Sequence, residues 1–218
     1  ALTHLYDKIS SSIDNMQFTV GVFIDLSKAF DTVNHNILLE KLEHYGIRGT
    51  ALTWFSSYLS DRKQFVEFNG YCSTPCKIQC GVPQGSILGP LLFLVYINDL
   101  CNISDVLDMI LFADDTNIFF SHNDMNFLSE TINKDLAKLT QWCLANKLTI
   151  NLKKSSYIIF RPRQKRQTLD LSVKINDNLI ARAKETVFLG VILDENLSWK
   201  PHILNVSRKI SKSIGIIY

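Results

Sequence analysis

The hydrophobic positions at the start of the chain change from a helical to a strand pattern. Residues 1–16 carry an apolar side chain every three or four positions, which predicts a helix with one buried face. Residues 18–24 form an uncharged, largely aromatic and β-branched run, which predicts a strand covered on both faces in the centre of a sheet. The run stops at Asp25, and a carboxylate there is costly to bury unless it is paired or bound to a metal. A helix N-cap or a salt bridge would satisfy Asp25 equally well.

Apolar spacing and turn residues predict the remaining elements. Helices are expected over residues 27–45, 52–59, 91–100 and 124–146, and from Pro201 onward. Strands are expected in a hairpin of residues 64–68 and 77–80, in a second hairpin over 109–120, and over 157–160, 171–175 and 186–193. Strands and helices alternate without strict β-α-β regularity. We therefore predict an α+β fold in which an antiparallel central sheet has helices packed on one side.

Two adjacent carboxylates, Asp114 and Asp115, lie at the tip of the second predicted hairpin. Carboxylates held this close repel each other unless a cation lies between them, and Mg²⁺ or Mn²⁺ prefers such oxygen ligands. A solvated hairpin tip would explain the doublet by itself. If the strands before Asp25 and Asp114 are neighbours, however, three carboxylates converge at one edge of the sheet. That arrangement can hold two divalent ions and predicts metal-dependent phosphoryl or nucleotidyl transfer, as in polymerases, nucleases and cyclases.

A second unusual stretch covers residues 81–90, with three Gly and two Pro before an apolar helix. Glycines before a helix let a backbone or a ligand approach without interference from a Cβ. Gln84 is the one long polar side chain in this stretch. A plain structural loop is the alternative interpretation.

Composition limits the partners of the chain. Its 218 residues are 46% hydrophobic with a net charge of +2, enough for one sizeable core or two closely packed subdomains. The longest apolar run, residues 91–97, is too short to span a bilayer, so no membrane partner is expected. The sequence does not begin with Met and shows no secretory leader. We expect a piece of a longer polyprotein.

The five cysteines do not have the spacing of a disulfide scaffold. Cys72, Cys76 and Cys80 are evenly spaced, but the fourth ligand that a structural zinc site needs is missing from any familiar position. We therefore expect reduced thiols in a protein of the nucleus and cytoplasm.

Residues 153–166 are rich in positive charge. The basic side chains are Lys153, Lys154, Arg161, Arg163, Lys165 and Arg166. A solvated hairpin loop is one interpretation. Contact with a phosphate backbone is the other, and it predicts salt-dependent binding.

Several segments, in this order, resemble the motifs of reverse transcriptases of non-LTR retrotransposons, the jockey-like lineages in particular. Residues 23–31, 81–90 and 112–115 resemble motifs A, B and C, respectively. Residues 151–155 resemble motif D, and residues 188–202 resemble motif E and the segment that follows it. The resemblance covers essentially the whole chain. It implies an RNA-directed DNA polymerase with the palm of a right-hand polymerase, partial fingers and the start of a thumb.

The resemblance also implies a division of the chain. Residues 1–17 would end the fingers and lead into the palm, and 18–35 would carry palm motif A. Residues 36–80 would form helices and a hairpin of the fingers and palm. Residues 81–185 would carry palm motifs B, C and D, and 186–218 motif E and the start of the thumb.

The resemblance implies which residues handle the metal ions and the triphosphate. Asp25 and Asp114 would hold two Mg²⁺ ions, with Mn²⁺ as an alternative ion. The carbonyl of Leu26 would be a further ligand, and Asp115 would be engaged less tightly. Lys154 would lie near the triphosphate and protonate the pyrophosphate leaving group.

Other residues would bind the substrates, again by resemblance. Phe30 would lie under the incoming sugar and exclude a 2′-hydroxyl. Gln84 and Gly85 would contact the incoming nucleotide and the template strand. The primer end would be held by Phe188, Leu189 and Gly190.

The implied partners are an RNA template, a DNA primer, deoxynucleoside triphosphates and the rest of the polyprotein. The family's fingers segment would precede Ala1, and the thumb is cut short at Tyr218, so the isolated chain need not polymerise. Two other accounts stay open. One is a catalytically incompetent, palm-like RNA-binding module, which would have no need for three carboxylates at a sheet edge. The other is a metal-dependent nuclease.

Overall fold

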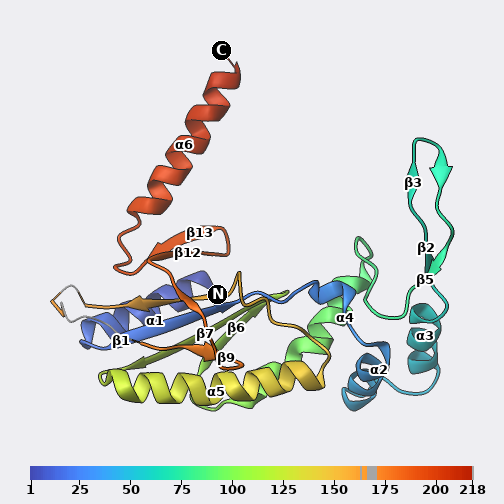
Figure 1. Ribbon diagram of the computed structural model, residues 1–218, viewed down its shortest axis with the longest axis horizontal. Helices are drawn as coiled ribbons and strands as arrows, with labels where there is room; N and C mark the ends of the chain where they lie inside the picture. Colours follow the sequence, from blue (N-terminus) through green and yellow to red (C-terminus); the bar gives the residue numbers. More distant parts are fainter. Residues whose placement is uncertain (163, 166–170, 218) are drawn as a thin grey trace.

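The computed structural model describes residues 1–162, 164–165 and 171–217. Its centre is a five-stranded sheet in the order β11-β8-β1-β7-β6 (Figure 1). Only the edge pair β11–β8 is parallel, and the other pairs are antiparallel. The strands of this sheet are β1 (Phe18–Ile24), β6 (Asp108–Phe112), β7 (Asp115–His122), β8 (Ser156–Phe160) and β11 (Ala181–Arg182). The predicted α+β fold is therefore confirmed, with one parallel strand at the edge of the sheet.

The strand β1 is the middle of the sheet, as its uncharged sequence predicts. All seven of its residues are buried, between β7 and β8. Gly21 is required there, because a Cβ at this position would lie 2.8 Å from the Phe119 ring of β7. The same ring packs edge-on against Phe23, with centroids 5.7 Å apart. Dense packing on both faces fixes the register of β1.

Helices cover the sheet on both faces. The long helix α5 (Met125–Ala145) and α4 (Leu88–Ile97) pack against one face of β1 (Figure 1). Helix α1 (Leu2–Asp14) covers the opposite face through Leu5 and Ile9, together with the hairpin that follows the sheet. Each of these fully buried side chains contributes about 1.5–3 kcal/mol. The expectation of helices on one side only was therefore wrong, because the alternate residues of β1 need cover of their own.

Two segments project from the body of the protein at opposite ends (Figure 1). One is a two-stranded arm formed by β2 (Lys63–Gln64) with β5 (Cys76–Lys77), and by β3 (Glu67–Phe68) with β4 (Tyr71–Cys72). The other is helix α6 (Lys200–Ile217). The remaining elements are η1 (Ala29–Asp31), α2 (His35–His44), α3 (Thr50–Leu59), η2 (Asn98–Ile103), β9 (Lys174–Ile175), β10 (Asn178–Leu179), β12 (Glu185–Phe188) and β13 (Val191–Asp194).

Two predicted elements are each divided in the structure. The helix expected over residues 27–45 is divided into η1 and α2, because Lys28 adopts a left-handed φ of 50° and Asn34 caps the amide groups at the start of α2. The strand expected over 186–193 is a hairpin of β12 and β13, because Leu189 and Gly190 both adopt positive φ values and turn the chain.

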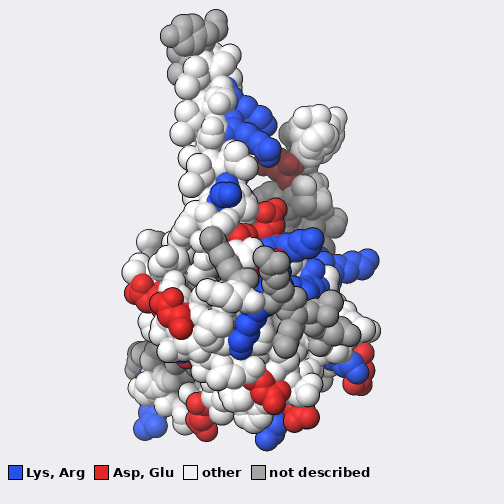
Figure 2. Space-filling view, turned by 90° about the vertical axis from the view of Figure 1, so that its left-hand side faces the viewer, with Lys and Arg blue, Asp and Glu red and all other residues white. Residues whose placement is uncertain are grey.

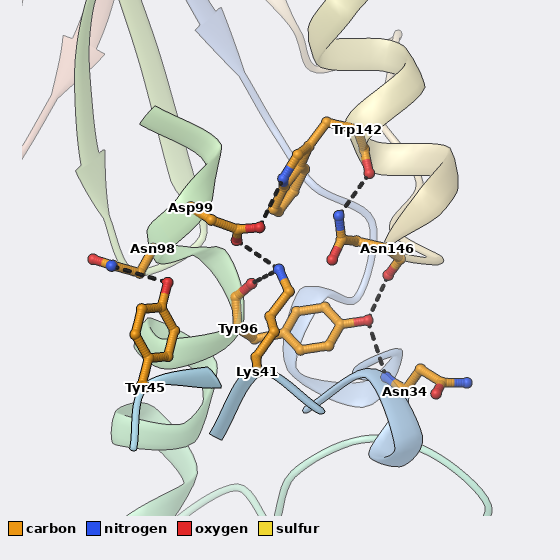
Figure 3. A network of polar contacts seen from close by, with 8 residues as sticks. All are labelled: Asn34, Lys41, Tyr45, Tyr96, Asn98, Asp99, Trp142 and Asn146. Carbon is orange, nitrogen blue, oxygen red and sulfur yellow. Dashed lines mark hydrogen bonds and ion pairs between the residues drawn. The ribbon is translucent and has the colours of Figure 1, made fainter. Parts of the chain in front are cut away.

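A polar network joins three helical segments beneath the sheet (Figure 3). Lys41 of α2 donates to the backbone oxygen of Tyr96 and to Asp99 Oδ1, each at 2.6 Å. The indole nitrogen of Trp142 on α5 donates to the other carboxylate oxygen at 3.3 Å. Burial lowers the pKa of Lys41, and the hydrogen bond and charge of Asp99 act in the opposite direction. This network ties α2 to α4, η2 and α5.

The hydroxyl of Tyr96 extends the network (Figure 3). It donates to the carbonyl of Asn146 at 2.6 Å and accepts from the amide of Asn34 at 3.3 Å. Asn34 is the cap of α2, and Asn146 follows the last residue of α5. The segment after η1 is therefore held at a fixed position relative to the sheet.

Candidate active site

The ends of β1 and the β6–β7 hairpin lie next to each other. Ile24 pairs with Thr116, so the following residue, Asp25, comes opposite Asp115. Asp114 occupies the turn between β6 and β7, where the preceding Ala113 has a φ of 51°. The predicted hairpin is present, and its two acidic residues lie at the end of the sheet where β1 reaches Asp25.

Two cavities share the Asp25 side chain. The first has a volume of about 420 Å³, and its lining includes Asp25, Leu26, Phe30, Gln84, Asp114 and Lys154. The second, of about 230 Å³, is lined by Asp25, Asp115, Lys154 and Phe188, among others. Eight of the expected site residues therefore surround two adjoining cavities.

Three expected site residues do not line either cavity. Gly85 lies beyond Gln84 with a φ of 80°, and Leu189 and Gly190 form the turn of the β12–β13 hairpin. Phe188 itself is buried against Phe23, with ring centroids 6.4 Å apart. The hairpin therefore brings one residue of the 188–190 segment to the site, and the other two lie at its turn.

The acidic cluster is electrostatically strained. Burial raises the pKa of Asp115, and the charges of Asp114 and Asp25 raise it further. The ammonium group of Lys154 lies 3.8 Å from Asp25 Oδ2, but its side chain is 70% exposed. An ion pair with that much solvent contact contributes little stability.

Negative charge and carboxylate oxygens suit a hard divalent cation. Within the described residues, no three Asp, Glu, His or Cys side chains are grouped closely enough to hold a metal by themselves. Asp25 and Asp114 face one cavity and Asp115 the next, so the donor set fits an ion that also takes oxygens from outside the chain.

Ser155 supports Asp25 from the neighbouring segment. Its buried hydroxyl accepts a hydrogen bond from the Asp25 amide at 3.2 Å and donates to the Asn151 carbonyl at 2.9 Å. The Asn151 amide donates to the Asp25 carbonyl at 2.8 Å. Sequence reasoning placed residues 151–155 in a motif but gave Ser155 no role, because nothing local shows that its partner is 130 residues away.

Two other contacts position the residues around the first cavity. The ring of Phe30 packs on Phe93 of α4, with centroids 4.5 Å apart. Gln84 donates from Nε2 to Asp31 Oδ1 at 2.7 Å. Gly81 lies so close to Asp31 that an added Cβ would come within 2.7 Å of its carbonyl oxygen. The glycine-rich stretch therefore packs directly on the segment that follows Asp25.

The basic residues after Lys154 are only partly available to phosphates. Arg161 pairs with Glu195 at 3.4 Å, and the ammonium group of Lys165 lies over the Phe18 ring at 4.5 Å. Arg163 and Arg166 lie outside the described residues. A second basic group lies on α6, where Figure 2 shows Lys and Arg side chains along one side of the projecting helix.

The arrangement defines a class of protein: an α+β palm in which aspartates at the ends of the strands line a cavity of about 420 Å³. The family model for reverse transcriptase (RNA-dependent DNA polymerase) matches residues 4–193. The chain belongs to this reverse transcriptase family.

Curated relatives agree with the resemblance to mobile-element enzymes. The chain is 29% identical over 214 residues to the probable RNA-directed DNA polymerase from transposon BS of Drosophila melanogaster, covering 92% of this chain and 23% of that protein. It is 29% identical over 211 residues to the RNA-directed DNA polymerase from mobile element jockey of the same species, covering 94% and 23%. The chain thus spans about a quarter of these relatives' length, and its kinship with non-LTR retrotransposon reverse transcriptases is confirmed.

Solved structures agree on the fold. Telomerase from Candida tropicalis, in complex with a fragment of telomeric RNA, superposes with a TM-score of 0.57 at 12% identity, covering 92% of this chain and 33% of that one. Telomerase from Candida albicans gives a TM-score of 0.55 at 13% identity, covering 91% and 33%. In the described ranges, no helix combines the length and the apolar character needed to cross a bilayer.

Proposed function

We propose that this chain is the catalytic palm of an RNA-directed DNA polymerase that extends a DNA primer on an RNA template with deoxynucleoside triphosphates. The observation that carries the proposal is the shared cavity of Asp25 and Asp114, two residues brought together from distant parts of the sequence. The family supplies the reaction class.

Asp25, Asp114 and, less directly, Asp115 would hold two Mg²⁺ ions. Leu26 lines the first cavity with Asp25 and Asp114, and its carbonyl would be a further ligand. When bound, the ions would stabilise the charge on the attacking and leaving oxygens. The chain's own residues position the substrate. Phe30 provides a wall for the sugar and Gln84 a polar contact for the nucleotide.

Lys154 is placed to neutralise the triphosphate. It lines both cavities, and its ammonium group can leave Asp25 at little cost, because the pair is exposed to solvent. The ammonium group of Lys154 would therefore be free to pair with a phosphate that binds beside Asp25.

We further propose that the chain acts within a longer polyprotein in the nucleus and cytoplasm. The share of the curated relatives that it spans supports the longer polyprotein.

Primer extension on an RNA template with Mg²⁺, carried out on the chain in its full-length context, tests the function. Asp114→Asn should lower the rate at least about 100-fold, because a charged oxygen donor is lost at the reacting centre. Asp105→Asn, an exposed residue of the turn before β6, is the matched control and should polymerise normally. Equal incorporation by all three proteins would end the proposal. RNA binding that is insensitive to chelator, without any extension, would favour the non-catalytic RNA-binding module.

A further inference from the structure

A third cavity adjoins the aspartate site. It has a volume of about 680 Å³ and shares Lys28 and Gln84 with the first cavity. One wall is the base of the β2–β5 arm, which contributes Arg62 and Lys77. A ligand can therefore extend from the aspartates past Gln84 to the arm.

The lining of this cavity is cationic. Lys28, Arg62 and Lys77 face one carboxylate, Asp31, which already accepts a hydrogen bond from Gln84. In the part of the chain that the structure describes, neither Lys28 nor Arg62 takes part in an ion pair. The cavity thus has unneutralised positive charge.

Arg62 points to an anion more specifically. Its Nε is buried and has no hydrogen-bond partner, while its guanidinium group lies 5.3 Å from the centre of the Tyr58 ring. A buried donor without an acceptor is rare in a folded protein. The planar guanidinium matches the oxygens of a phosphate.

Farther along the same arm, three aromatic side chains are mostly exposed. Phe65, Phe68 and Tyr71 are 58%, 73% and 83% exposed. Exposed rings that continue from a cationic groove are the combination by which proteins bind single-stranded nucleic acids, with phosphates in the groove and bases stacked on the rings. Stacking on three rings needs several bases, and a nucleoside triphosphate has only one.

We propose that the arm and its basal cavity bind the unpaired template strand. Lys28, Arg62 and Lys77 contact its phosphates, and Phe65, Phe68 and Tyr71 stack on its bases. This inference rests on the proposed polymerase function for the identity of the strand. It needs no metal ion, so its test is independent of catalysis.

Binding of a fluorescent single-stranded RNA oligonucleotide, measured by anisotropy with chelator present, tests the inference. Arg62→Gln and the double variant Phe68→Ala/Tyr71→Ala should each weaken binding about tenfold. Arg62→Gln should also lower the slope of log affinity against log salt by about 0.7. Asp61→Asn should strengthen binding, because it frees Lys77 from a 2.6 Å ion pair.

Two control variants each remove one positive charge or one aromatic ring at a site outside the arm. Lys134→Gln and Phe127→Ala change exposed residues of α5, whose start lies at the other end of the molecule from the arm (Figure 1). Both should bind RNA like the parent chain. Circular dichroism and thermal melting verify that every variant is folded.

Several results would overturn the inference. They are unchanged RNA affinity in the arm variants, weakened binding of a nucleoside triphosphate but not of the oligonucleotide, and altered self-association without a change in RNA affinity. Failure of primer extension, with the arm variants still binding RNA weakly, would remove the polymerase function and leave the strand-binding arm in place.

Discussion

The ammonium nitrogen of Lys154 lies 3.8 Å from Oδ2 of Asp25. Both residues line each of the two cavities beside the aspartates. The lysine follows the loop that hydrogen-bonds to the end of β1, so its position depends on the same backbone contacts that hold Asp25. Cation and carboxylate are therefore presented together to whatever enters the cavities.

We expect Lys154→Gln to slow nucleotide incorporation by at least about tenfold, because the variant lacks a positive charge and a proton donor beside the triphosphate. Stability should hardly change, since the pair is exposed. Single-turnover incorporation and urea unfolding measure the two effects. Lys153→Gln is the matched control, because Lys153 is exposed and lines neither cavity. Equal rates for the two variants would remove the role of Lys154.

Ser155→Ala should destabilise the chain by about 1–3 kcal/mol, because the Asp25 amide loses its acceptor in a buried position. The adjacent Ser156→Ala should have a smaller effect, since the Ser156 hydroxyl makes no hydrogen bond among the described residues. Urea denaturation of the two variants gives the comparison. Identical midpoints would show that the Ser155 contact is not structural support for Asp25.

Much of this site follows from the sequence. The uncharged run of β1 and the apolar residues around Asp114 predict strands that end in carboxylates. Whether those strands lie side by side is not contained in the local pattern. In the structure β1 pairs with β7, the strand after Asp114, and β6 lies one strand farther out.

Other features depend on contacts that no local pattern contains. Apolar spacing continues through residues 27–45, although the left-handed Lys28 interrupts the helix. Motif order places Leu189 and Gly190 in a primer-binding segment, and no local pattern shows that they form the turn of a hairpin and line neither cavity. The pairing of Arg161 with Glu195 joins segments 34 residues apart and removes that arginine from the free basic charge.

Phe30→Ala should admit ribonucleotides, because the ring that we propose to exclude a 2′-hydroxyl is then missing from the cavity. Loss of the ring contact with Phe93 should also destabilise the chain by about 1 kcal/mol. Phe30→Tyr keeps the ring and should keep the discrimination. The ratio of kcat/KM for matched deoxy- and ribonucleotides measures it. An unchanged ratio in Phe30→Ala would refute the steric role.

Alkylation at pH 8 should distinguish Cys143 from the other cysteines. Burial against the core raises the pKa of Cys143 to about 12, so almost none of it is the reactive thiolate. Cys72, Cys76, Cys80 and Cys101 are exposed free thiols. Burial also raises the pKa of Cys101, which should therefore react more slowly than the thiols of the arm.

Mass spectrometry should show four adducts on the native chain and a fifth only after denaturation, because solvent then reaches Cys143. Added zinc should leave the adduct count unchanged. Protection of Cys72, Cys76 and Cys80 by zinc would instead reveal a metal site on the arm, and rapid native labelling of Cys143 would show that α5 does not bury it.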